Sequence, residues 1–290
     1  MTRRARSLLL VAALLVAGCN ATRVAYDNAD TLLRWRAASY LDVRGEQAEA
    51  LDLHIARLLA WHRAHALPQY SRLAEESATR MTRGLSREDL VWGYDSLRGQ
   101  LRESVLAAAA QTGDLLDRLS PGQIAVLQER LDEDNRKFAK EQLAGSLEER
   151  RERRCKRNLA RLEDWLGALT DEQVELVRRY SERVPVALDE LRDRRRRRLQ
   201  AEFMDIVRAR QAKARLAGFA AQIVPPSDEE LGPAYAAALR ATTATYFDML
   251  LELDRSLTPR QRGRVVARLR GLATDFSQLA QAGAGAGGAR

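Results

Sequence analysis

The sequence predicts an all-α protein, an elongated multi-helix bundle with long helices, some of them kinked. Hydrophobic residues recur three and four positions apart, whereas the period-two alternation of a half-buried strand is absent. Leu159, Leu162 and Leu166 belong to one such series, which places an apolar stripe along one side of a helix. Proline and glycine fall between these series, where they indicate helix ends.

Four helices are predicted in the first part of the chain. A short helix is expected at about residues 30–41 and a second at about 45–66. Pro68 can open the third, because proline suits the first turn of a helix. The fourth is expected to span about residues 87–117.

The later helices are longer. The first is expected to bend at Gly145 and the second to kink at Pro185, since a proline ring removes a backbone hydrogen bond. Pro225 and Pro226 form the clearest break in the chain. The predicted helices after residue 118 span about residues 121–167, 171–222, 233–254 and 259–281.

The chain divides into four parts on composition. Residues 1–18 read as a signal peptide, and residues 19–118 as an N-terminal helical part that is rich in aromatic residues and expected to pack better than the rest. Residues 119–281 form a part with long, Arg-rich, more exposed helices. Residues 282–290 contain mainly Ala and Gly, have little to bury, and are expected to form a flexible tail.

The first residues have the layout of a secretory signal, with three arginines, an apolar run over residues 8–16, and small residues after it. The run is too short to cross a bilayer, which takes roughly 20 apolar residues. Val16, Ala17, Gly18 and Cys19 resemble the lipobox of bacterial lipoproteins. The alternative is an ordinary signal followed by a chance cysteine.

The lipobox resemblance implies a location in the cell envelope. Cleavage before Cys19 and attachment of a diacylglycerol thioether would make the membrane a partner through this lipid anchor, which two or more acyl chains hold stably. Asn20 follows, where an Asp tends to retain Gram-negative lipoproteins in the inner membrane. The resemblance therefore favours the outer membrane, facing the periplasm, over the inner membrane.

Charge and cysteine content exclude some classes of protein. Loss of residues 1–18 leaves 45 basic against 40 acidic residues, a net charge of +5, which does not argue for nucleic acid as a partner. Cys155 would be the one remaining thiol, so no internal disulfide can form. Cations surround it in sequence and could make it reactive; the alternative is an incidental cysteine on a helix surface.

A helix-start phrase recurs, of the form Leu-Ser/Thr-x-x-Gln, with a weaker copy at Leu85–Asp89. The hydroxyl of the second residue can N-cap a helix, and the glutamine side chain at the third helical position can reach back to close a capping box. The capping residues and their glutamines are Ser120 and Gln123, Thr170 and Gln173, and Thr258 and Gln261.

Two family resemblances follow. The Leu-Thr-x-x-Gln phrase is similar to the signature of the Spy/CpxP family of periplasmic helical chaperones and stress sensors, although members of that family are smaller and not typically lipid-anchored. A broader resemblance links the chain to uncharacterised helical lipoproteins of Gram-negative bacteria. It implies a cellular location and a fold, but it does not imply an activity. It rests on residues 26–30, 32–35, 41–43, 46–47, 60–63 and 67–70.

No pattern for catalysis, a cofactor or a metal is found. His54, His62 and His65 share one side of a helix, but zinc needs three or four ligands and no other motif supplies them. These histidines are expected in the core or at its rim, where His62 can hydrogen-bond to another helix. The basic runs at residues 149–157 and 192–198 are either solvated faces or contacts for anionic partners.

We therefore expect a non-enzymatic envelope protein that binds an envelope partner through its helical surface. The alternative is a tethered chaperone or stress sensor of the Spy/CpxP kind that holds unfolded protein clients. An enzyme whose site is assembled from distant residues is a third reading, because such sites leave no linear motif.

Overall fold

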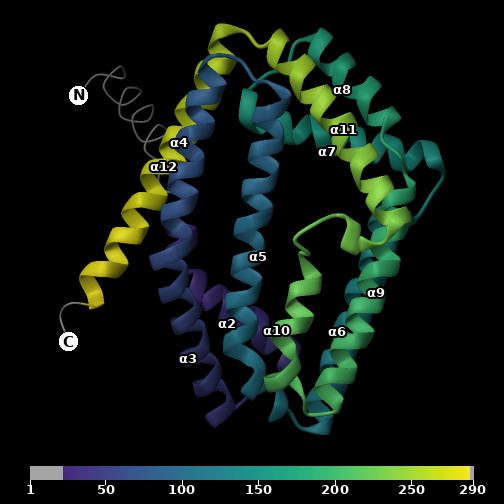
Figure 1. Ribbon diagram of the computed structural model, residues 1–290. Helices are drawn as coiled ribbons and strands as arrows, with labels where there is room; N and C mark the ends of the chain where they lie inside the picture. The colour runs from purple at the N-terminus through teal and green to yellow at the C-terminus, as the bar shows by residue number, and fades with distance from the viewer. Residues whose placement is uncertain (1–21, 288–290) are drawn as a thin grey trace, which may run out of the picture.

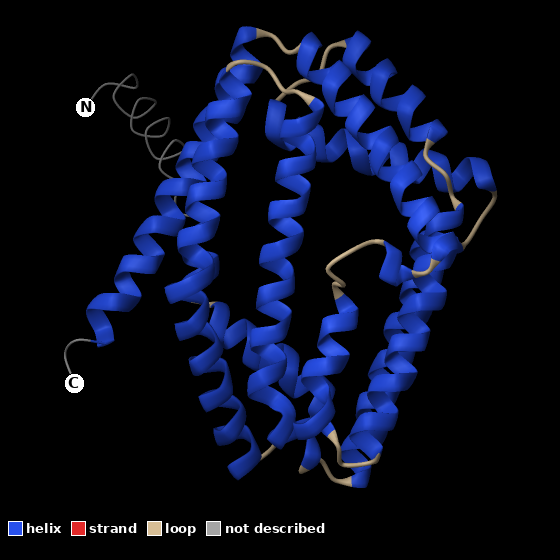
Figure 2. Cartoon of the chain, in the orientation of Figure 1, coloured by secondary structure: helices blue, strands red, loops and turns tan. Residues whose placement is uncertain are grey.

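The computed structural model describes residues 22–287 and confirms the all-α prediction. The described residues form helices and loops and contain no strand (Figure 2). The lipobox residues Val16, Ala17, Gly18 and Cys19 lie outside the described residues. None of the described helices is long and apolar enough to cross a membrane.

The helices follow one another with short connections (Figure 1). Their bounds are α2 (Ala29–Leu41), α3 (Glu46–Trp61), η1 (His62–Ala66), α4 (Leu67–Thr82), α5 (Arg87–Asp117), α6 (Pro121–Phe138), η2 (Ala139–Leu143), α7 (Leu147–Leu166), α8 (Asp171–Arg183), α9 (Ala187–Arg208), α10 (Ala212–Ile223), η3 (Glu229–Leu231), α11 (Pro233–Ser256) and α12 (Pro259–Gly287).

The last helix packs beside an early one. α12 runs antiparallel to α4, so the Ser71 hydroxyl donates to the Ala273 carbonyl and Arg262 donates to the Met81 carbonyl, 2.7 Å in both cases. Two buried clusters hold the bundle together. One joins α3, α5 and α6 to α9 and α10, and the other joins α7 and α8 to α11 and α12.

Pro68 does not begin a separate helix. α3 continues through the wider π-helical turn η1 into α4, and the Leu67 N–H bonds to the His62 carbonyl five residues back. Proline lacks an N–H and its ring crowds the preceding turn. The wider turn gives that ring room without ending the helix, as π-bulges do.

Two of the predicted long helices are each divided. In the segment predicted as 121–167, the first helix ends in the π-helical turn η2, and a new helix starts after Gly145, which has a φ of +88°. The segment predicted as 171–222 breaks at Pro185 and again near Arg210, which has a φ of +57°. The second break was missed, because nothing in the local residues 209–211 predicts it.

The last helix continues into the residues predicted as a tail. α12 extends to Gly287, beyond the predicted end of this helix at about residue 281. In the N-terminal part, α2 buries none of its residues fully, although several of them pack against the core.

α5 and α10 approach each other closely at Gly113. A Cβ atom on Gly113 would lie 2.7 Å from the backbone Cα of Lys213. Asp117, one turn further along α5, accepts hydrogen bonds from the Ala212 and Lys213 N–H groups at 2.7 and 3.0 Å. It thereby caps α10, whose own Gln211 provides no side-chain cap.

We expect Gly113→Ala to destabilise the protein by about 2–3 kcal/mol, because the added methyl group must push two helix backbones apart. Gly99→Ala, on the same helix but with no atom within 4 Å of its added Cβ, should instead stabilise by roughly 0.5–1 kcal/mol through helix propensity. Chemical unfolding of both variants measures the two effects. Equal effects of the two substitutions would contradict the close approach.

Candidate functional site

All three Leu-Ser/Thr-x-x-Gln phrases form capping boxes. Ser120 starts α6 and Thr170 starts α8, and each hydroxyl accepts the N–H of the glutamine three residues on. Thr258 does the same at α12, accepting from the Gln261 N–H at 3.2 Å. Each glutamine side chain accepts in return the backbone N–H of its own capping residue at 2.8–3.1 Å.

The glutamines also pair with one another. Gln173 Nε2 donates to Gln261 Oε1 at 3.0 Å, and Gln261 Nε2 donates to Gln173 Oε1 at 2.9 Å. Each amide also donates to the carbonyl at the end of the other helix hairpin, Ser256 or Ala168. The Gln173 side chain has 0% exposure and every polar atom of it is bonded. The pair therefore locks the α7–α8 turn onto the α11–α12 turn.

A second pair repeats this geometry. Gln123 Nε2 donates to Gln47 Oε1 at 2.7 Å and to the Asp42 carbonyl at 3.0 Å. Gln47 Nε2 donates to Gln123 Oε1 at 3.3 Å and to the Arg118 carbonyl at 3.0 Å. This pair locks the α2–α3 turn onto the α5–α6 turn, at the opposite end of the molecule in Figure 1.

Gln47 was missed in the sequence. Val43 and Gln47 stand four residues apart, as Leu and Gln do in the other phrases, but Arg44 occupies the capping position and Gly45 precedes α3 with a φ of +54°. A search for a hydrophobic residue followed four positions later by Gln, with Gly between them, would have included this copy. The partner of each glutamine lies 76 or 88 residues away, so the pairing itself leaves no local signal.

The weaker phrase, Leu85–Asp89, replaces glutamine by a buried aspartate. Asp89 closes a capping box with Ser86 and accepts from the Arg80 and Arg83 guanidiniums at 2.6 and 2.8 Å. Burial alone raises the pKa of Asp89, but the hydrogen bonds from Ser86, Arg80 and Arg83 outweigh it and hold the pKa well below its ordinary range.

We expect Asp89→Asn to lower the free energy of unfolding at pH 7, and this difference from wild type to shrink as the pH falls below about 4. The folded-state pKa is depressed, so the stability from Asp89 is present above the unfolded-state pKa and is lost on acidification. Urea unfolding at pH 7 and pH 3.5 measures this. Asp205→Asn, an exposed control on α9, should stay near wild type at both values. A difference that does not depend on pH would contradict the ionised state.

The arginine-rich runs are not simply solvated. Arg154 is buried and donates to the Val184 carbonyl at 2.9 Å, while Arg150 donates to the Val186 carbonyl at 3.3 Å. These carbonyls flank Pro185, where the helix breaks and backbone acceptors lose their partners. Arg154 also pairs with Asp189 at 3.0 Å. Part of the arginine excess therefore satisfies the carbonyl ends of helices.

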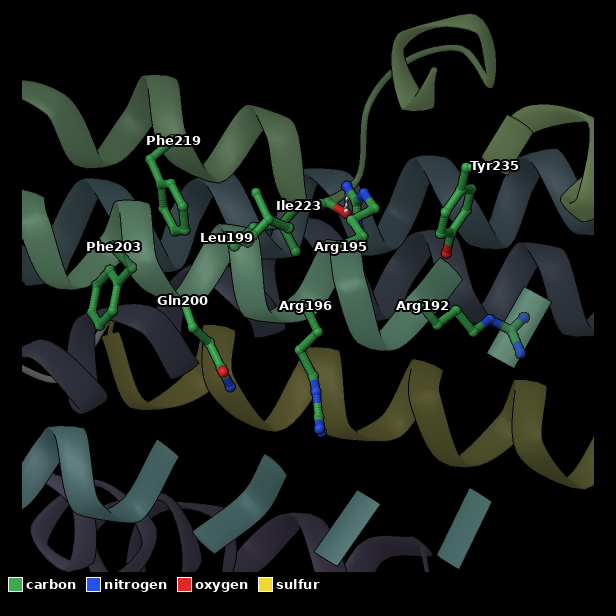
Figure 3. A pocket seen from close by; sticks show the side chains of 9 residues that line it. All are labelled: Arg192, Arg195, Arg196, Leu199, Gln200, Phe203, Phe219, Ile223 and Tyr235. Carbon is green, nitrogen blue, oxygen red and sulfur yellow. Dashed lines mark hydrogen bonds between the residues drawn. The ribbon is translucent and has the colours of Figure 1, made fainter. Parts of the chain in front are cut away.

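The second basic run borders an apolar groove of about 560 Å³ between α9, α10 and α11 (Figure 3). Phe203 and Phe219 pack against each other at one end, with tilted rings whose centroids are 5.7 Å apart, and Tyr235 lies at the other end. Leu199 and Ile223 lie between them, and Gln200 also lines the groove. The side chain of Gln200 has a buried oxygen that finds no hydrogen-bond partner among residues 22–287.

Three arginines form the rim of this groove: Arg192, Arg195 and Arg196. Arg195 donates to the Gln222 and Ile223 carbonyls at the end of α10, and burial lowers its pKa. Among the described residues no carboxylate forms an ion pair with Arg195. It keeps its charge, since a guanidinium stays protonated in proteins. The groove therefore joins apolar surface to uncompensated positive charge.

The remaining candidates do not gather into a site. His62 does hydrogen-bond outside its own helix, to the Tyr26 hydroxyl at 3.0 Å, and burial together with Arg63 lowers its pKa. His65 instead bonds to the Trp61 carbonyl. Cys155 is buried, which corrects the surface position considered from the sequence. Within residues 22–287 no group of three or more His, Cys, Asp or Glu could hold a metal ion.

Comparison with known proteins finds one family. A model described as a family of unknown function, DUF6279, matches residues 39–222. The match covers α3 through almost all of α10, and includes the Gln47–Gln123 pair, Gln173 and most of the groove. No curated protein and no solved structure matches the chain.

Proposed function

The chain belongs to DUF6279, a family of unknown function, and we propose that it is a lipid-anchored, non-enzymatic envelope protein that binds a partner in the groove of α9 and α10. The anchor part of this proposal rests on the lipobox at Val16–Cys19. The binding part rests on one observation: an apolar groove lined by Arg195, a cation that forms no ion pair with a carboxylate among the described residues.

The groove suggests the chemistry of the partner. Burying an aliphatic or aromatic side chain contributes about 1.5–3 kcal/mol, so the floor favours an apolar segment. Arg192 pairs with Asp189 at 3.6 Å and Arg196 with Asp193 at 3.3 Å, whereas Arg195 pairs with no acid in the part of the chain that the structure describes. A partner with apolar side chains next to a negative charge fits both features.

A tethered chaperone of unfolded clients is the second candidate function. An exposed apolar surface flanked by the cations of residues 149–157 and 192–198 would favour it, and the groove is lined by the second of these two runs. The groove is open and its floor is mainly apolar, so it can accept apolar segments of varied sequence. A chaperone and a single-partner protein differ in how many proteins they bind.

An aggregation assay separates the two candidates. The mature protein is added near equimolar to several unrelated, chemically unfolded proteins, and light scattering is followed without ATP. Suppression across all of them would support the chaperone. Suppression of none, together with a crosslink from position 203 to one envelope partner in cells, would support the single-partner function. If the protein suppresses no aggregation and forms no crosslink, binding at the groove is overturned.

A further inference from the structure

One side of the N-terminal helical segment carries large apolar side chains that nothing in the described structure covers. Val24, Leu32 and Trp35 are 58%, 61% and 65% exposed. Residues 22–41 are helical apart from a turn at Asn28, and at about 100° per residue these three side chains fall within about 80° of one another. Single exposed apolar residues are ordinary, whereas an aligned set marks a contact surface.

The contacts of α2 with the rest of the bundle do not account for the apolar side chains on this side of the helix. None of its residues is buried, and its contacts with α3 and α6 include Ala37 and Tyr40, which lie about 140–160° around the helix from Val24 and Trp35. Arg36 lies beside the exposed side chains and donates to the Tyr40 hydroxyl at 2.7 Å. Within the described residues it forms no ion pair with a carboxylate, so its charge is available to an anionic group.

Distance along the chain suggests what covers this surface. Val24 follows Cys19 by five residues, which cannot span more than about 18 Å even when fully extended. A lipid on Cys19 would therefore keep Val24 close to the bilayer surface. Tryptophan and arginine are both favoured at that depth, where an amphipathic ring meets the headgroups and a cation meets phosphate.

We propose that Val24, Leu32 and Trp35 form a membrane face that lies in the headgroup region of the bilayer holding the Cys19 lipid, with Arg36 against a lipid phosphate. This inference rests on the lipid anchoring proposed above. The face adds a second contact to the lipid and fixes which side of the bundle faces the membrane. A second copy of the chain is the competing occupant, and the experiment below distinguishes it.

The test uses the lipidated protein in vesicles of phosphatidylethanolamine and phosphatidylglycerol, with and without brominated acyl chains that quench nearby tryptophans. We expect quenching in the wild type that is lost in Trp35→Phe and kept in Trp165→Phe, a matched control on α7. Trp35 is mostly exposed, so its replacement should leave the fold intact.

The outcomes separate the membrane face from the anchor. Protein that floats with the vesicles but shows equal quenching in the wild type and Trp35→Phe would overturn the membrane face alone. If the protein floats with the vesicles but Trp35 is protected from solvent only at high protein density, a second copy of the chain covers this surface. That result would also overturn the membrane face. Protein that does not float at all would overturn the anchor, and the membrane face with it.

Discussion

Cys19→Ser should leave the protein as an uncleaved, unlipidated precursor that incorporates no labelled palmitate. The reason is chemical: in the proposed anchor the lipid would be joined through a thioether, which a serine hydroxyl does not form, and cleavage of a lipoprotein signal follows lipidation. The effect is expected to be all or none, since without acyl chains the anchoring of about 0.8 kcal/mol per buried CH₂ disappears.

Metabolic labelling and fractionation measure this, with Asn20→Ser as the matched neighbour that should still be lipidated. Mature-length protein with normal membrane retention in Cys19→Ser would show that residues 1–18 are an ordinary signal and that the lipobox resemblance is fortuitous. In that case the groove could still bind a partner, but the protein would not be tethered.

Gln173→Ala should lower the free energy of unfolding by about 3–4 kcal/mol, the largest effect expected of a single side chain here. The substitution leaves the Gln261 amide, the Ser256 carbonyl and the Thr170 N–H without their partner in a buried site. Each such group costs roughly 1–3 kcal/mol when no water replaces the bond.

Two comparisons make this prediction sharper. Gln123→Ala removes the same chemistry at the partly exposed pair, where water can replace the lost bonds, and should cost only about 1–2 kcal/mol. The double variant Gln173→Ala/Gln261→Ala should cost less than the sum of its single variants by about 1–3 kcal/mol. Equal losses at both pairs, or strict additivity, would mean that the glutamines act as separate caps.

The fold could be predicted from the sequence where local chemistry decides it. The start of α5 at Arg87 follows from Ser86 and Asp89, and α6 and α8 begin where Ser120 and Thr170 cap them. The missed features depend on distant contacts. Nothing near Arg210 indicates that α9 ends there, because that end is made by α5: Arg210 donates to the Asp117 carbonyl at 2.9 Å.

The candidate site was predicted only in part, for the same reason. The run at residues 192–198 was recognised as basic, but its groove needs Phe219 from α10 and Tyr235 from α11, which no spacing brings together. The glutamines were recognised as caps and not as pairs. Arginine was read as a surface residue, whereas Arg154 satisfies the carbonyl that the break at Pro185 leaves open.

The most direct test of groove binding is the affinity for a labelled, unfolded peptide with apolar residues beside an acidic one, measured by fluorescence anisotropy. Ile223 is 40% exposed in the groove, and Leu147, at the start of α7, is 46% exposed outside it. Glutamate at either position should be tolerated by the fold. We predict binding at least about tenfold weaker for Ile223→Glu, a change of about 1.4 kcal/mol, and wild-type binding for Leu147→Glu. Wild-type affinity in Ile223→Glu would contradict the groove as the binding site.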